Sequence, residues 1–552
     1  MAAGLPMQVV GLCFWLVLSL VGCSAEVSTA AVAAAPAPAP GGSCEAVLVD
    51  ARAAVAETDE AFVCATLDWW PPEKCDYGTC AWGLAGLLNL DLSSKILLNA
   101  VKAFSPIKLR LGGSLQDFLV YGTGSTGEPC LPFTKNTSAM FGFTRGCLPM
   151  HRWDELNAFF HKSGAQIIFG LNALNGRVPM PDGSLGGPWD YTNADSFIRY
   201  TVEKGYHMYG WELGNELGGT GVGARIDADQ YSADVITLNQ IVGKAYQGSK
   251  PLVIAPGSFF DAAWFTEFVG KTKPNQVDVI THHIYNLGPG VDTHLIDKIL
   301  DPSYLDGEAS TFSSLQGILK SAGTSAVAWV GEAGGAYNSG HHLVTDAFVF
   351  SFWFLDQLGM SAKYDTKSYC RQTLVGGNYG LLNTTTFEPN PDYYSALLWH
   401  RLMGTKVLST TFNGTNKIRA YTHCARDSEG ITLLLINLSG NSTNHIYVTS
   451  EGAHEDMHPY SSKEHRSFRR IPKLSEAAKL TREEYHLTPK DGNLQSQHML
   501  LNGNVLATDA NGGIPKLEPV QVEGTQPITV GPYSIVFAHI PSFYAAACRK
   551  IV

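Results

Sequence analysis

The sequence has few charged residues. Asp, Glu, Lys and Arg make up only 16% of the 552 residues, whereas aromatic residues make up 11%. This balance excludes an intrinsically disordered chain. The 56 glycines and 28 prolines follow no fixed period, which excludes collagen. Because 50 acidic residues outnumber 39 basic ones, the net charge is −11 at pH 7, and nucleic acids and strongly anionic polymers are not expected as general partners.

Long apolar runs are also scarce, and the one present is VGLCFWLVLSLVGC at residues 10–23. It ends on the small residues Ser24 and Ala25, which predicts a secretory signal peptide over residues 1–25. A signal anchor is the alternative, but the run is shorter than the ~20 residues that a spanning helix needs. Residues 26–43 form an Ala/Pro-rich tether. We therefore expect a secreted extracellular or cell-wall protein without an integral span, with a membrane-associated or vacuolar location as alternatives.

Metal-binding cysteine motifs are missing, since no C-x-x-C pair occurs. Two of the 11 cysteines lie in the signal segment, and the nine others fit an oxidising compartment. The spacing predicts two local disulfides, Cys75 with Cys80 and Cys130 with Cys147, while the odd count leaves one thiol free or joined to another chain. Glycosylation signals support the same route and occur at Asn136, Asn383, Asn413, Asn437 and Asn441.

Short β-rich runs alternate with helical patterns over residues 61–402. In the segment 230–246, for example, Tyr231, Val235, Leu238 and Val242 recur at helical spacing. Strands separated by helices pair in parallel, and about eight such units predict an α/β fold of the (β/α)8 TIM-barrel type. The expected strands are FVCATLDW, IKLRLGG, AQIIFGLNAL, MYGWELGNE, LVIAPGS, VDVITHHIY, SAVAWVGEAG and a weaker eighth near MSAKYD at residues 360–365.

From residue 403 to residue 552 the pattern changes to strands separated by turns, which predicts a C-terminal antiparallel β-sandwich domain. We expect the segment 44–60, which precedes the first barrel strand, to add a strand to this domain.

Catalytic residues of TIM barrels lie at the carboxyl ends of strands. In MYGWELGNE, period-two alternation places Tyr209, Trp211 and Leu213 toward the helices, so that Glu212 and Glu216 point into the barrel. In SAVAWVGEAG the same rule turns Val327 and Trp329 toward the helices and leaves Ala326, Ala328, Val330 and Glu332 inward. Two carboxylates, Glu216 and Glu332, at one barrel mouth suit glycosidic bond cleavage.

Several neighbouring residues carry weaker signals. Glu212 is expected to be a buried, paired structural acid. Arg110 faces inward on the second strand, where it could either pair with Glu212 or keep a nucleophilic carboxylate ionised. His282 and His283 point to opposite faces of their strand, so no metal site and no cofactor are expected. The GGTGVG segment at residues 218–223 lacks the Lys and Ser/Thr of a phosphate loop and is interpreted as an active-site loop.

The motifs together resemble heparanase and the plant heparanase-like proteins, the family 79 glycoside hydrolases. The resemblance covers nearly all of the mature chain and is carried by LRLGGSLQDFLVY, WELGNE, THHIYNLGPG, WVGEAGGAYNSG, GGNYGLL and PYSIVFAHI. It implies a (β/α)8 barrel joined to a β-sandwich and hydrolysis of β-glucuronidic linkages with retention of configuration. The implied substrate is a glucuronic-acid-containing glycan.

The resemblance also assigns roles to individual residues. Glu216 matches the acid/base and Glu332 the nucleophile. The matching substrate-binding positions are Asn215 at the 2-hydroxyl, Asp117 at sugar hydroxyls, Tyr337, Asn338, Ser339 and Tyr379 at the uronate carboxylate, and His283 and Tyr285 in the pocket.

The chain departs from the family pattern at three places. Leu217 stands where proline usually follows the acid/base, Asn338 and Ser339 replace a Gly-Gly pair, and the excised segment of animal heparanase is missing. Two alternatives to a β-glucuronidase stay open: an endo-glycosidase acting on an internal uronate or neutral sugar, and a catalytically silent glycan-binding wall glycoprotein.

Overall fold

The computed structural model describes residues 45–125, 127, 129–450 and 480–549. The predicted signal peptide and tether lie outside these residues. In the part of the chain that is described, no helix has the length and apolar character needed to cross a membrane.

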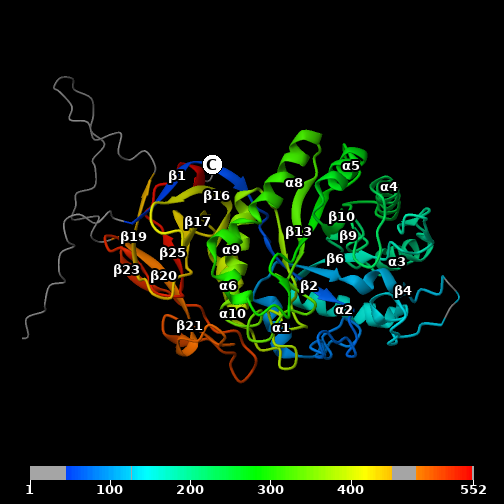
Figure 1. Ribbon diagram of the computed structural model, residues 1–552, viewed down its shortest axis with the longest axis horizontal. Coiled ribbons are helices and arrows are strands. Elements are labelled where there is room, and N and C mark those ends of the chain that lie inside the picture. The colour runs from blue at the N-terminus through cyan, green and yellow to red at the C-terminus, as the bar shows by residue number, and fades with distance from the viewer. Residues whose placement is uncertain (1–44, 126, 128, 451–479, 550–552) are drawn as a thin grey trace, which may run out of the picture. The chain divides into compact units, whose positions relative to one another are not determined.

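Eight parallel strands close into a barrel, which confirms the predicted fold (Figure 1). In chain order they are β2 (Val63–Asp68), β3 (Ile107–Gly112), β6 (Ala165–Leu171), β9 (Gly210–Leu213), β10 (Leu252–Phe259), β11 (Val279–Ile284), β13 (Val327–Ala333) and β15 (Tyr369–Arg371). Seven lie where the β-rich runs predict them. The eighth prediction is wrong, because MSAKYD forms the end of a helix and the turn after it. The true eighth strand has only three residues, too few to show a periodicity.

Ten α-helices occur in the described residues: α1 (Lys95–Lys102), α2 (Met150–Ser163), α3 (Thr192–Glu203), α4 (Ala228–Ala245), α5 (Ala262–Thr272), α6 (Leu295–Ile299), α7 (Pro302–Asp306), α8 (Ala309–Ala322), α9 (Phe350–Lys363) and α10 (Pro391–Leu402). Local signals set several of their ends. The Asp261 carboxylate caps α5 by accepting the Trp264 N–H at 2.9 Å. Helix α2 ends at Gly164, whose φ of 76° suits a residue without Cβ.

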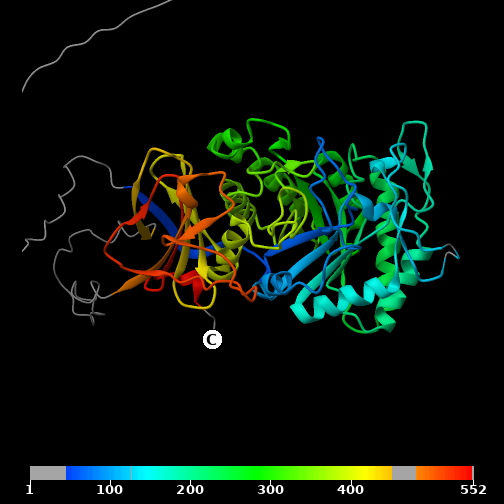
Figure 2. The ribbon, with the colours of Figure 1, turned by 90° about the horizontal axis from the view of Figure 1, so that it is seen from below.

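Six of the remaining strands form three two-stranded sheets, β4 (Leu119–Tyr121) with β5 (Gly146–Leu148), β7 (Val178–Pro179) with β8 (Leu185–Gly186), and β12 (Gly288–Pro289) with β14 (Ala336–Tyr337). The other eleven form one mostly antiparallel sheet, which matches the strand-only pattern predicted from residue 403. Its members are β1 (Ala46–Glu57), β16 (Met403–Phe412), β17 (Ile418–Ala425), β18 (Ile431–Asn437), β19 (Asn444–Ser450), β20 (Thr481–Pro489), β21 (Met499–Leu501), β22 (Asn504–Val505), β23 (Val520–Glu523), β24 (Ile528–Val530) and β25 (Ile535–Ile540). The N-terminal strand β1 pairs with β16 and β19, and it lies among these C-terminal strands in both views (Figures 1 and 2).

Helix α9 joins the barrel to this sheet. Nearly all of its residues are buried, and it contacts β1, β16 and β17. The carboxylate of Asp356 accepts hydrogen bonds from Arg419 and from the Tyr421 hydroxyl, each at 2.7 Å. Gly359 lies against the Tyr421 ring, where a Cβ would come within 2.3 Å of the ring atoms. The absence of a side chain at Gly359 therefore allows the close approach.

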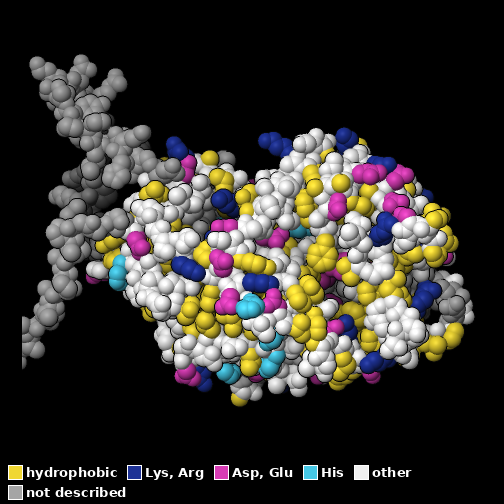
Figure 3. Space-filling model, in the orientation of Figure 1, with side chains coloured by type: hydrophobic (Ala, Val, Ile, Leu, Met, Phe, Trp, Pro, Cys, Tyr) yellow, Lys and Arg dark blue, Asp and Glu magenta, His cyan; other side chains and the backbone are white. Residues whose placement is uncertain are grey.

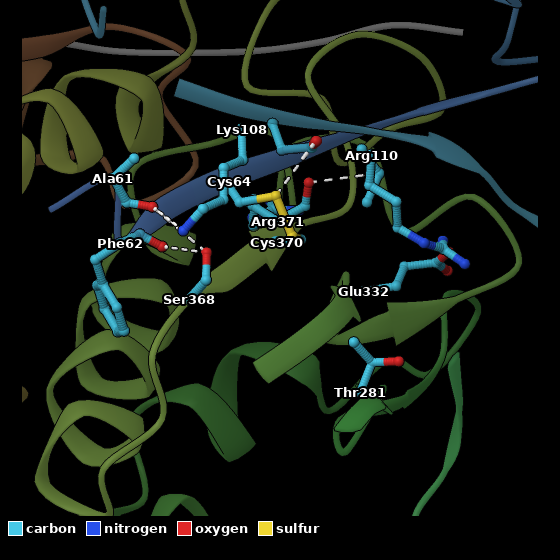
Figure 4. Close-up of a disulfide and its surroundings, with 12 residues drawn as sticks. Ala61, Phe62, Cys64, Lys108, Arg110, Thr281, Glu332, Ser368, Cys370 and Arg371 are labelled. Carbon is cyan, nitrogen blue, oxygen red and sulfur yellow. Dashed lines mark hydrogen bonds and ion pairs between the residues drawn. A yellow bond between two sulfur atoms is a disulfide. The ribbon is translucent and has the colours of Figure 1, made fainter. Parts of the chain in front are cut away.

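Four disulfides join the eight described cysteines. Cys75–Cys80 and Cys130–Cys147 confirm the two predicted pairs. Cys424–Cys548 ties β17 to the segment after β25. Cys64–Cys370 links β2 to β15, the first and last strands of the barrel, and lies in its interior (Figure 4). The remaining cysteine beyond the signal segment, Cys44, lies outside the described residues.

Candidate active site

The two predicted acids meet at the carboxyl end of the barrel. Glu216 follows β9 on a turn in which its own φ is 57°, and its N–H donates to the Gly257 carbonyl at 2.7 Å. Glu332 lies near the end of β13. Both side chains are buried, and an oxygen of one lies within 4.8 Å of an oxygen of the other.

Glu332 faces inward for a reason that differs from the predicted alternation. Trp329 packs inside the barrel with Ile168, Ile254 and Val279, whereas Val330 joins the core outside the barrel. The orientation predicted for Val327, Trp329, Ala326, Ala328 and Val330 is therefore wrong. A register irregularity between Val330 and Glu332 shifts the alternation by one residue and turns Glu332 back into the barrel. On β9 the prediction holds for Trp211 and Leu213, whereas Tyr209 stacks on Trp329.

Arg110 connects three residues beneath the pocket. Its Nε donates to Glu212 at 2.5 Å, its Nη1 to Glu332 at 2.7 Å and its Nη2 to Asn215 at 2.9 Å. Arg110 thus pairs with Glu212, as one of the two alternatives holds, and it also contacts Glu332, the carboxylate predicted to be the nucleophile. Glu212 is buried as expected and also accepts a hydrogen bond from Thr281 at 3.1 Å.

The two adjacent histidines of β11 separate as predicted. His283 Nδ1 lies 2.9 Å from Glu216 Oε1, whereas His282 packs on Phe312 of α8, outside the barrel. Burial lowers the pKa of His283 to about 4 and that of His282 to about 3. The hydroxyl of Tyr285 donates to Glu332.

The two buried acids differ in the groups beside them. Burial raises the pKa of Glu216 to about 7, although the charge of Arg110 opposes the shift. Glu332 instead forms a direct ion pair with Arg110. One carboxyl group is thus suited to carry a proton near neutral pH, while the other faces a guanidinium. This division of tasks is the one that acid/base and nucleophile need.

A pocket of about 380 Å³ opens above the acids. Of the predicted site residues, it is lined by Glu216, Glu332, Tyr285, Tyr337, Asn338, Ser339 and Tyr379. Val222, from the segment interpreted as an active-site loop, also lines it. The pocket contains further residues that the sequence analysis missed: Asp68, Trp70, Lys74, Asp76, Trp82, Ser114, Phe259 and Gln372.

Three predicted residues lie behind the pocket wall. His283 and Asn215 contact Glu216 and Arg110 as described above. The two oxygens of Asp117 accept the backbone N–H groups of Ala173 and Asn215, at 2.7 and 2.8 Å. Asp117 therefore holds the chain just before Glu216, and it is not among the residues that line the pocket, so its contact with sugar hydroxyls stays a prediction.

Asp68 lines the pocket, whereas Asp117 does not. It ends β2, and Gln372 donates to both of its oxygens at 3.2 Å. Burial, together with the charge of Glu332, raises its pKa. The rule that found Glu332, an acid at the carboxyl end of a barrel strand, applied to β2 would have found Asp68. Gln372 was missed because it follows the strand that was misplaced.

Glu216, His283 and Glu332 could each offer one atom to a metal ion within the same 4.8 Å. A cation there would compete with Arg110 for the Glu332 carboxylate, because the guanidinium already lies 2.7 Å away. The donor set therefore suits proton transfer better than metal binding.

Comparisons with known proteins agree with this architecture. Residues 44–359 match the model of glycosyl hydrolase family 79, N-terminal domain. Heparanase-like protein 3 of Arabidopsis thaliana is 58% identical over 91% of this chain and 94% of its own length. Baicalin-beta-D-glucuronidase of Scutellaria baicalensis is 48% identical over 90% and 92%.

Among solved structures, a 4-O-alpha-L-rhamnosyl-beta-D-glucuronidase from Fusarium oxysporum 12S shares the fold, with a TM-score of 0.62 and 14% identity over 89% of this chain and 100% of that chain. The extent of the family match and the identity to the plant relatives lead to one conclusion: the chain belongs to glycoside hydrolase family 79 and is a heparanase-like glycoside hydrolase.

Proposed function

We propose that the chain is a retaining β-glucuronidase in which Glu332 is the nucleophile and Glu216 the acid/base. The observation that carries the proposal is the close approach of the acids: one oxygen of Glu216 lies within 4.8 Å of one oxygen of Glu332, which fits the ~5 to 5.5 Å carboxyl separation of a retaining pair better than the ~6.5 to 9.5 Å of an inverting pair. The names of the baicalin-beta-D-glucuronidase and of the rhamnosyl-glucuronidase support glucuronic acid as the sugar whose linkage is cleaved.

The proposed reaction has two steps. Glu332 attacks the anomeric carbon while the protonated Glu216 gives its proton to the departing oxygen, and a glycosyl ester forms on Glu332. Water then attacks the anomeric carbon, Glu216 takes a proton from that water, and the Glu332 carboxylate leaves. The pKa of about 7 at Glu216 suits a group that gives and then regains one proton.

Backbone donors supply the proposed binding site for the uronate carboxylate. Asn338, Ser339 and Gly340 have φ values of 57°, 69° and 68°, and within the described residues their N–H groups form no hydrogen bond. Successive N–H groups in such a turn form a concave anion site. The Tyr379 ring lies beside this turn and lines the same pocket. Neutral donors bind a carboxylate without neutralising Glu332.

Extracellular or cell-wall glycans carrying β-linked glucuronic acid, of the arabinogalactan type or related, are the proposed substrates. Heavily sulfated chains fit less well. On the face shown in Figure 3, the Lys and Arg side chains of the described residues are scattered among acidic ones. Lys74 is the one cationic side chain among the residues that line the pocket.

Aromatic β-glucuronides are a second candidate, favoured by a specific observation. Trp70, Phe259 and Tyr337 line the pocket, and Phe259 and Tyr337 remain about 40% exposed there, at 39% and 41%. Exposed aromatic faces at a pocket suit a planar leaving group. Phe259→Ala should then reduce kcat/KM on an aryl glucuronide about tenfold and spare a glucuronyl oligosaccharide.

The decisive experiment compares a 4-nitrophenyl β-glucuronide with the matching β-glucoside. We expect at least ~100-fold higher kcat/KM on the glucuronide, because the carboxylate donors stay unpaired when the glucoside binds. Tyr379→Phe should narrow this gap. Equal rates on the two substrates would leave a glycosidase of other specificity.

Secretion is part of the proposal and has its own test. Intact-mass analysis should find a mature chain that starts near Glu26 and carries N-glycans, whereas an unglycosylated chain retaining residues 1–25 would contradict secretion. The exposed sites Asn136, Asn413 and Asn441 should be occupied. Asn437 should not, because it is buried and its amide donates to the Ser442 and Gly531 carbonyls, each at 2.8 Å.

A further inference from the structure

The turn proposed to bind the uronate carboxylate has an unfavourable backbone. Asn338 and Ser339 both have positive φ, a conformation that glycine adopts freely and that residues with a Cβ disfavour. Family resemblance places a Gly-Gly pair here. In this chain some other contact must hold the two residues in this conformation.

A small hairpin lies against this turn. Asp76 and Thr79 exchange two backbone hydrogen bonds of 2.9 Å around Tyr77 and Gly78, whose φ values of 52° and 85° are those of a two-residue type I′ turn. The disulfide Cys75–Cys80 closes the hairpin over residues 75–80. Both sulfur-bearing residues are exposed, so the disulfide contributes little to the core.

The hairpin contacts both left-handed residues. The Ser339 hydroxyl donates to Asp76 Oδ2 and accepts from Trp82 Nε1 at 2.9 Å. The Asn338 amide donates to the Tyr77 hydroxyl at 3.1 Å. Because the hydroxyl of Ser339 is buried and engaged in both directions, its side chain is committed to the hairpin rather than to a sugar.

Asp76 is itself anchored. Its other oxygen lies 2.8 Å from Nζ of Lys74, and that ammonium group lies 4.3 Å from the centroid of the Trp70 ring. A chain of contacts thus runs from the pocket rim through Lys74 and Asp76 to Ser339. These contacts hold the Asp76 carboxylate in the orientation in which it accepts the hydrogen bond from the Ser339 hydroxyl.

We propose that hairpin 75–80 is a clamp for uronate recognition, in which Asp76 is a positioning residue that acts through Ser339. The proposal rests on the β-glucuronidase function proposed above. If the clamp opens, the two residues relax to negative φ and their N–H groups no longer converge on the carboxylate. Binding of a uronic acid then weakens, whereas cleavage of a neutral sugar is unaffected.

Two sets of variants of the full-length chain test the clamp. Cys75→Ser with Cys80→Ser opens the hairpin, and Cys130→Ser with Cys147→Ser is its control, because that disulfide does not line the pocket. Asp76→Ala removes the acceptor of Ser339, and Asp91→Ala, an exposed aspartate that caps its own turn, is its control. Michaelis parameters are measured on the β-glucuronide and the β-glucoside, with thermal unfolding to verify folding.

We expect KM for the glucuronide to rise about tenfold in both test variants, while kcat and the rate on the glucoside stay within about twofold of wild type. The controls should keep the wild-type ratio of glucuronide to glucoside kcat/KM. Asp76→Ala also distinguishes a positioning role of the Asp76 carboxylate from a direct effect of its negative charge. Loss of a negative charge beside the pocket alone would improve binding of an anionic sugar, so a lower KM would overturn the clamp.

A glycine rescue completes the test. In the background Asn338→Gly with Ser339→Gly, opening the hairpin should change KM less than twofold, because glycine needs no external support. The clamp would be refuted if opening the hairpin raised KM for the glucuronide equally in the glycine background. It would also be refuted if the folded Cys75→Ser/Cys80→Ser and Asp76→Ala proteins kept the wild-type ratio of glucuronide to glucoside kcat/KM. A wild-type protein that does not prefer the glucuronide would instead refute the proposed function.

Discussion

Nη1 of Arg110 lies 2.7 Å from Oε2 of Glu332, although 222 residues separate them in the sequence. Figure 4 shows the two side chains pointing toward one another from different strands of the barrel. The same guanidinium contacts Glu212 and Asn215, and Asn215 directly precedes Glu216. One buried cation therefore orients both halves of the proposed catalytic pair.

Replacing Arg110 should lower the activity even when the positive charge is kept. Arg110→Lys keeps the charge but cannot bridge three acceptors in one plane. We expect kcat/KM to fall at least ~100-fold, with a lower melting temperature. Lys108→Met is the matched control. It removes a buried cation two residues earlier on β3, whose partner is Asp59, and should lower stability while sparing kcat/KM of the folded protein. Equal losses of activity would contradict the bridging role.

The two acids should differ in their response to the leaving group. Glu332→Ala should abolish turnover on every substrate. Glu216→Ala should lose roughly 100-fold or more on poor leaving groups and much less on activated ones, since these need little protonation. Rates measured on a series of aryl glycosides test this. A loss of the same size across the series would count against Glu216 as the acid.

Activity should decline on the alkaline side of neutrality. Glu216 must be protonated to give up its proton, and its pKa lies at about 7. Above that pH, kcat/KM on a poor substrate should fall about tenfold per pH unit. This alkaline decrease should be absent in Glu216→Gln, whose kcat/KM should be low and independent of pH in this range. A wild-type profile still rising above pH 8 would contradict this assignment.

His282 should make the fold sensitive to acid. Neither of its ring nitrogens has a hydrogen-bond partner within the described residues, and burial lowers its pKa to about 3. Below its ordinary value of 6.5 the unfolded chain binds a proton that the folded chain does not, so stability falls as the pH falls. His282→Leu should therefore gain about 2 kcal/mol more in unfolding free energy at pH 5 than at pH 8. The exposed His161→Leu serves as the control.

The disulfide inside the barrel should act on stability alone. Cys64–Cys370 closes the seam between β2 and β15 across 306 residues, and both cysteines are buried (Figure 4). Replacing both with alanine should reduce the unfolding free energy by about 4 kcal/mol, because a long loop is released in the unfolded chain. The glucuronide-to-glucoside ratio should not change at low temperature. A changed ratio in a folded variant would place this disulfide in substrate recognition.

Local patterns were sufficient for much of the site. Glu216 and Glu332 could be placed because each lies at the end of a strand with clear flanking structure, and Arg110 because its strand alternates without a break. Where the backbone departs from regularity, the prediction was wrong. The bulge on β13 reversed the faces of Val330 and Trp329, and the three-residue strand β15 hid Gln372.

The sequence by itself determined the barrel, the strand-rich second domain, the two acids and the disulfides that close short loops, because each of these follows from spacing over a few residues. Only the tertiary structure decided that Asp68 rather than Asp117 lines the pocket, that Cys64 meets Cys370, and that the hairpin over residues 75–80 supports Ser339. Cys64 and Cys370 lie 306 positions apart in the sequence, Asp76 and Ser339 lie 263 positions apart, and the choice of Asp68 depends on which way the chain turns. These contacts arise when the barrel closes, and no periodicity along the chain encodes them.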